Sequence, residues 1–183
     1  MERVLDVAAY LFDKYKEVSG TRIDEMKLHK LLYFAQRQSL AVFGSPLFIE
    51  PFQAWKYGPV CVDVRSNYTE DGIIGGIRSD IPDVMSRLLD EILLFYGSFE
   101  SWKLSQMTHD ETSWKNARVG LNPDAYGSEL IKIEDIQKDA VRSLETNTAF
   151  SNDNIRLNMN NIKVVQMLPA SWNSPEDDIY DRI

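Results

Sequence analysis

Apolar residues recur three and four positions apart along most of this chain, the spacing that places them on one face of an α-helix. The pattern is clearest over 81–97, where Ile81, Leu88 and Ile92 share a stripe. Asp24 and Asp80 each precede a predicted helix, where a carboxylate can accept bonds from first-turn N–H groups. The predicted helices cover residues 2–18, 24–43, 60–68, 81–97, 101–107 and 133–145, and a further turn is expected around 112–118.

The segment Phe48–Tyr57 has a different pattern. Apolar and polar residues interleave there, which predicts one or two short strands or an extended loop. Gly58 lets the backbone turn tightly, and Pro59 suits the first turn of the helix that follows. The predicted fold is therefore mainly α, a compact helical domain with a short β-hairpin or extended insert.

Two parts are expected along the chain. Residues 1–120 form the helical domain, and residues 121–183 form a C-terminal helix plus a partly ordered acidic extension. From Thr146 the chain is rich in Thr, Asn and Ser, interrupted by a strand-like stretch at 155–159 and an apolar run at 162–168. Polar segments of this kind often gain order from a partner.

Composition narrows the function classes. The chain has 183 residues, a net charge of −8 and a single cysteine, Cys61, which we expect to be a small buried apolar group. There is no apolar run of the ~18–20 residues that cross a bilayer, and no basic-then-apolar leader, so we expect a cytoplasmic protein without a membrane partner. Residues 1–60 carry a net charge of +1 and the rest −9, which argues against direct nucleic-acid binding and favours basic protein surfaces.

Catalytic signatures are weak. The sequence has no phosphate-binding glycine loop, nucleophile elbow or His-Glu-x-x-His pair, and no metal or cofactor is expected. Five acidic residues could in principle hold a metal: Asp63, Asp80, Asp83, Asp110 and Glu111. Asp80 is better explained as a helix cap, and Asp110 and Glu111 as first-turn acids that complement a helix dipole. His29 and His109 are expected to be structural, with His109 bonding a free carbonyl between two helices. A small hydrolase or nuclease using Asp63, His109 and Asp110 remains an alternative.

Polar and aromatic spacing is more informative. Lys27, Lys30 and Arg37 share the helix face opposite the leucine stripe, beside Tyr33, and are expected to present a polar face to a partner. The tryptophans at helix junctions have two open interpretations: they close the core and hydrogen-bond through the indole nitrogen, or some of them anchor a protein partner. These tryptophans are Trp55, Trp102 and Trp114.

The same segments resemble a known family. The matching stretches are Met26–Gln36 (MKLHKLLYFAQ), Pro46–Phe48, Phe52–Val60 (FQAWKYGPV) and Leu104–Trp114 (LSQMTHDETSW). Together they resemble the Panacea domain, the SocA-like or phage-associated GepA-like domain of bacteria and their prophages, over about residues 4–120. The chain departs from the family pattern at Thr112-Ser113, where a proline usually precedes the tryptophan.

This resemblance implies a mostly helical fold and an antitoxin that neutralises a cognate toxin, encoded next to it, by direct protein contact. One relative, SocA, instead delivers its toxin to the ClpXP protease, so a proteolytic adaptor is the alternative. The residues expected to bind the partner or to define the family motif are Lys27, Lys30, Tyr33, Arg37, Trp55, Tyr57, Gly58, Pro59, His109 and Trp114.

Overall fold

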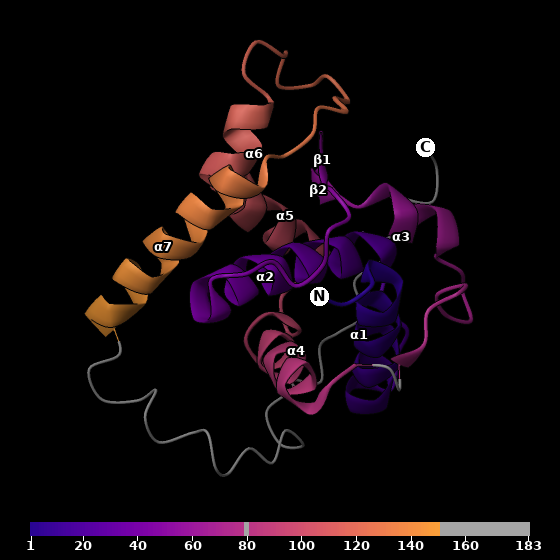
Figure 1. The fold of residues 1–183 in the computed structure, drawn as a ribbon. Coiled ribbons are helices and arrows are strands. Elements are labelled where there is room, and N and C mark those ends of the chain that lie inside the picture. Colours follow the sequence, from indigo (N-terminus) through magenta and orange to yellow (C-terminus); the bar gives the residue numbers. More distant parts are fainter. Residues whose placement is uncertain (79–80, 151–183) are drawn as a thin grey trace.

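The computed structural model describes residues 1–78 and 81–150 (Figure 1). The described part is mainly helical with one two-stranded hairpin, as predicted. Its elements are α1 (Val4–Ser19), α2 (Glu25–Phe43), β1 (Gln53–Trp55), β2 (Gly58–Val60), α3 (Val62–Asn67), α4 (Asp83–Tyr96), α5 (Ser101–His109), α6 (Thr112–Ala117) and α7 (Ile133–Phe150). Among these described helices, none is both long and apolar enough to cross a membrane.

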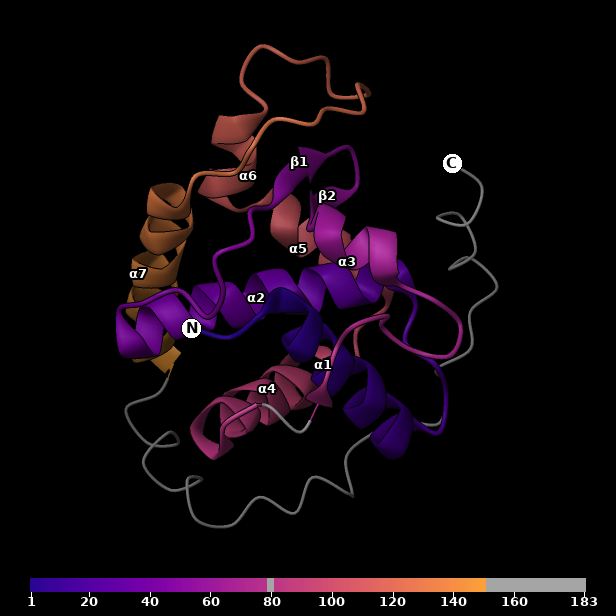
Figure 2. The same ribbon diagram turned by 45° about the vertical axis from the view of Figure 1, so that its right-hand side comes forward.

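Helix α2 is the centre of the fold. It packs against α1, α4, α5, α7 and β2, and it crosses the middle of the molecule in Figures 1 and 2. Thirteen of its 19 residues are buried. The side chain of Asp24 accepts a bond from the Lys27 backbone N–H (2.8 Å), and Gly44 ends the helix in the left-handed conformation. Local signals therefore fix both ends of a helix that other elements then enclose.

Helices α1 and α4 cover one side of α2. The stripe predicted for α4 is confirmed, with Leu88, Leu89 and Ile92 in the main core. The predicted start at residue 81 is wrong. The helix begins at Asp83, and Pro82 occupies its N-cap. The expected cap, Asp80, lies outside the described residues.

The hairpin is where the local prediction failed in part. Strands β1 and β2 pair antiparallel with Trp55 opposite Gly58, which confirms an extended segment before residue 58. Pro59, however, lies in β2 and not in the first turn of a helix; α3 begins only at Val62. The reason is that the preceding Gly58 has a φ of +104°, which closes the turn and sends the chain back along β1.

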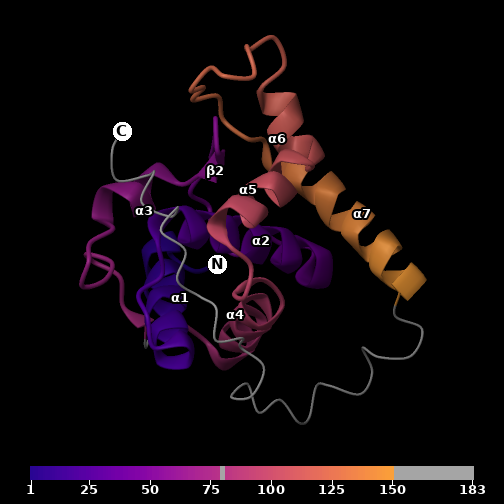
Figure 3. The same cartoon turned by 180° about the vertical axis from the view of Figure 1, so that it is seen from behind.

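The C-terminal helix α7 is part of the same packed structure. It lies against α2 and α6, which Figure 3 shows from behind, and it contributes Ile136 and Ala140 to the main core. The segment before it joins the hairpin, because Ala54 N–H donates to Glu129 O (2.8 Å) and Ile131 N–H donates to Phe52 O (2.8 Å). The predicted helix at 133–145 is confirmed and extends to Phe150. The strand-like and apolar stretches at 155–159 and 162–168 lie outside the described residues.

Candidate functional site

The polar face predicted on α2 is not exposed. Lys27, Lys30 and Tyr33 are buried, and the Arg37 side chain is only 11% exposed. The expectation that these residues present a polar surface to a partner is therefore wrong. The physical reason is that α5, α7 and β2 cover the side of α2 that α1 and α4 leave open, so that both faces are buried. Lys27 lies toward α1, where its Nζ donates to the Tyr15 hydroxyl (3.0 Å).

Lys30 fixes the hairpin to α2. Its Nζ donates to the Pro59 carbonyl oxygen (3.2 Å), and its Cε would lie 2.7 Å from a Cβ placed on Gly58. Burial lowers the pKa of Lys30 to about 7, although the carboxylates of Asp24 and Glu25 oppose this shift. Lys30 and Gly58 thus belong to one close contact between helix and hairpin.

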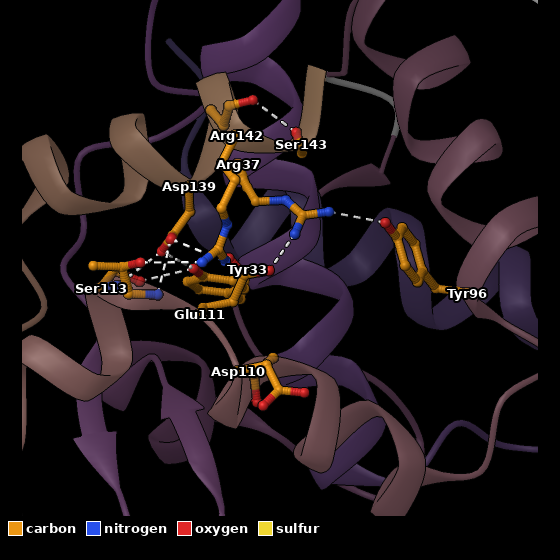
Figure 4. A network of polar contacts seen from close by, with 12 residues as sticks. Tyr33, Arg37, Tyr96, Asp110, Glu111, Ser113, Asp139, Arg142 and Ser143 are labelled. Atoms are coloured by element: carbon orange, nitrogen blue, oxygen red, sulfur yellow. Dashed lines mark hydrogen bonds and ion pairs between the residues drawn. The ribbon is translucent and has the colours of Figure 1, made fainter. Parts of the chain in front are cut away.

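Arg37 lies in a buried polar network that joins four elements (Figure 4). Its guanidinium donates to Glu111, which precedes α6, and to the Tyr96 hydroxyl of α4 (2.9 Å). Arg142 of α7 donates to the other oxygen of Glu111 (2.9 Å). Burial, followed by the nearby carboxylate of Asp139, raises the pKa of Glu111 against the opposing effect of Arg37. The expectation that Asp110 and Glu111 are first-turn acids is wrong, because α6 begins only at Thr112. Asp110 lies at the C-cap of α5, and Glu111 lies at the N-cap of α6 with its side chain bonded to two arginines.

Asp139 fixes the start of α6 from α7. Its two carboxylate oxygens accept the backbone N–H groups of Thr112 and Ser113, both at 2.8 Å. The Tyr33 hydroxyl donates to the same carboxylate (3.2 Å). Burial alone would raise the pKa of Asp139, but these N–H groups, the Ser113 hydroxyl and Arg142 outweigh it and lower the pKa. An acid between Ile136 and Ala140, on the buried stripe of α7, is the signal that sequence reasoning missed.

A surface groove lies beside the hairpin turn. Its volume is about 350 Å³. It brings together three of the predicted site residues: Tyr57, His109 and Trp114. The full lining is Lys56, Tyr57, Trp102, His109, Trp114, Lys115, Arg118, Leu121 and Pro123. The groove is therefore built from the hairpin turn, α5, α6 and the loop that follows α6.

Trp114 is held firmly in the wall of the groove. Its indole N–H donates to the Trp55 carbonyl (3.0 Å), as expected for a tryptophan at a helix junction. The His109 ring stacks on it with centroids 4.1 Å apart, and the Arg118 guanidinium lies 5.0 Å from its ring centroid. Arg118 also donates to the carbonyls of Ala54 (2.8 Å) and Ala125 (2.6 Å). Sequence reasoning missed Arg118, which orders the loop that completes the groove.

Comparison with known families supports the motif blocks. Residues 28–115 match the family described as "Antitoxin SocA-like, Panacea domain". This segment is therefore similar to the SocA-like Panacea domain. No curated protein and no solved structure matches the chain. The match includes six of the groove residues, while Arg118, Leu121 and Pro123 follow it.

The three residues of the hydrolase alternative do not meet in this groove. His109 lines it, but Asp63 and Asp110 do not. Burial and the positive charge of Lys30 lower the pKa of His109 to about 4, although its bond to the Lys56 backbone opposes this. His109 Nε2 is buried without a hydrogen-bond partner within the described part of the chain. Over the same residues, no group of three or more His, Cys, Asp or Glu side chains is placed to hold a metal ion.

The groove combines exposed aromatic and basic side chains. Trp102 is 54% exposed and meets Tyr57 edge-on, with ring centroids 6.2 Å apart. Lys56 and Lys115 lie at the rim. Tryptophan and tyrosine are enriched among the residues that dominate binding energy in protein interfaces. The groove thus presents exposed aromatic and basic side chains side by side.

Proposed function

We propose that this chain is an antitoxin that neutralises a cognate toxin by binding it directly, and that the groove beside the hairpin turn contacts the toxin. The observation that carries the proposal is the position of the motif residues. Tyr57, His109 and Trp114 lie in the segments that match the antitoxin family, and they line the same surface groove as the exposed Trp102.

The division of labour among the motif residues supports this interpretation. Internal contacts that hold the hairpin, α6 and α7 in place engage three of these residues: Lys30, Tyr33 and Arg37. They act on the partner only indirectly, as positioning residues for the groove. The acidic surplus beyond residue 60 adds long-range attraction to a basic toxin surface, which raises the rate of encounter.

Co-expression tests the proposal. The gene next to this one is induced alone, together with the wild-type chain, and together with Trp102→Ala or Phe95→Ala. Both rings are largely exposed, Trp102 at 54% and Phe95 at 64%, but Phe95 lies on α4 and does not line the groove. We expect growth arrest from the neighbour alone, rescue by wild type and Phe95→Ala, and loss of rescue by Trp102→Ala.

A harmless neighbour would exclude the antitoxin role. Equal rescue by Trp102→Ala and wild type would exclude the groove as the contact surface. Measuring the half-life of the toxin separates neutralisation from proteolytic delivery. A toxin that is degraded only when both this chain and ClpXP are present would replace direct neutralisation by the adaptor alternative.

A further inference from the structure

We infer that the groove binds an acidic segment of the partner protein that carries an aromatic or long aliphatic side chain. The inference rests on the proposed function only for the identity of the partner, since the chemistry of the groove is independent of it.

The charge of the groove is opposite to that of the chain. Of its nine lining residues three are Lys or Arg and none is acidic, whereas the whole chain has 28 acidic and 20 basic residues. The net charge of the chain therefore repels an acidic segment, whereas the lining of the groove attracts it. This contrast gives specificity as well as attraction, because wrong placements are penalised.

The rim lysines already hold carboxylates that a partner can replace. Lys56 Nζ lies 3.1 Å from Asp124 Oδ1, and Lys115 Nζ lies 3.8 Å from Asp110 Oδ1. Both aspartate side chains are more than 85% exposed, Asp124 at 86% and Asp110 at 87%. Exposed pairs of this kind contribute little to stability, so exchanging them for a partner carboxylate costs the fold little.

The aromatic walls favour a flat apolar group between the two lysines. Trp114 is fixed by its bond to Trp55 and held between the stacked His109 ring and the Arg118 guanidinium, so the part of it that lines the groove loses little freedom when a ligand binds. Trp102 and Tyr57 form a second aromatic pair in the lining, and Leu121 and Pro123 complete its apolar part. A ring or long aliphatic chain fills this space, while flanking carboxylates reach Lys56 and Lys115.

Selection from a random library of displayed 12-residue peptides tests the inference with the full-length chain as bait. We expect the enriched peptides to carry a net negative charge and at least one aromatic or long aliphatic residue. A synthetic peptide of the most enriched sequence should bind at least tenfold more weakly to the double variant Lys56→Glu/Lys115→Glu. Its affinity for Lys16→Glu, the same charge reversal on α1, should stay within twofold of wild type. Raising the salt concentration should weaken binding, because the contacts are charged and solvent-accessible.

A second variant guards against loss of folding as the explanation. Asp124→Asn removes the internal competitor for Lys56, so it should tighten peptide binding at least twofold, a gain that misfolding cannot produce. Enriched peptides without acidic excess, or equal binding by the double variant and wild type, would overturn the inference. Because no toxin is used, this result is independent of whether the neighbouring gene is toxic.

Discussion

Replacing Lys30 with methionine tests whether a buried amine shapes the stability of this domain. Lys30 is fully buried beneath the hairpin, and burial lowers its pKa from 10.5 to about 7. The unfolded chain therefore binds more protons than the folded chain between these values, so stability rises with pH in this range. Over pH 7 to 9 the rise amounts to roughly 2 kcal/mol from this one group, at about 1.4 kcal/mol per pH unit once the folded-state amine has lost its proton.

Few other shifted groups titrate in that window. The pKa values of His29 and His109 are lowered, so their effects fall at more acidic pH. Burial raises the pKa of Cys61 from 9.0 to about 11, so its opposing effect sets in near pH 9, at the end of the range. Lys30→Met should therefore leave little slope between pH 7 and 9. The free energy of unfolding of Lys30→Met at pH 7 should differ less from that of wild type than the slope does. The lost bond to Pro59 offsets part of the gain from removing a buried charge.

Urea unfolding at several pH values, followed by tryptophan fluorescence, measures this slope. Lys16→Met is the matched control, since Lys16 is exposed on α1 and its loss should leave the slope intact. A slope in Lys30→Met as steep as that of wild type would refute the assignment of the pH dependence to the buried amine.

Three further comparisons, of five substitutions in all, probe the contacts that build the groove. Gly58→Ala should cost more than ~2 kcal/mol in urea unfolding, because its φ is +104° and the new Cβ would lie 2.6 Å from the nearest side-chain atom; Gly20→Ala, at φ +74° with open space, should cost only ~1 kcal/mol. Asp139→Asn should lower the free energy of unfolding by ~2–3 kcal/mol near neutral pH, because the amide places a donor against backbone N–H groups. On acidification this variant should lose less stability than wild type. The lowered pKa of Asp139 means that the stabilisation by its carboxylate is lost as the pH falls. Trp102→Ala should change the unfolding free energy by less than ~1 kcal/mol, whereas Trp114→Ala should cost ~3 kcal/mol; equal losses would contradict their different burial.

The elements that could be predicted from sequence are those set by neighbouring residues. Asp24 and Gly44 bound α2 through bonds within one helical turn, so their types alone indicate where the helix begins and ends. Cys61 is buried, as its apolar character predicts. The start of α4 and the place of Pro59 could not be predicted in the same way. Pro59 suits a helix start equally well when its pairing with β1 is unknown.

The interior of the site depends on contacts between distant residues. Arg37 and Glu111 are 74 positions apart, and Tyr33 and Asp139 are 106 apart. A polar residue opposite a leucine stripe is exposed only if nothing covers it, and the elements that cover α2 come from much later in the chain. The groove likewise combines residues 56–57 with residues 102–123. The motif residues were recognisable, but their division into internal contacts and groove lining required the fold.

The central claim is that the groove holds a toxin, and binding between the two purified proteins tests it most directly. Titrating the neighbouring gene's product into the full-length chain in a calorimeter should give a one-site complex with wild type and with Phe95→Ala. Trp102→Ala combined with Lys56→Glu should weaken that complex at least a hundredfold while circular dichroism shows an unchanged helical fold. An affinity equal to that of wild type in this double variant would contradict the account.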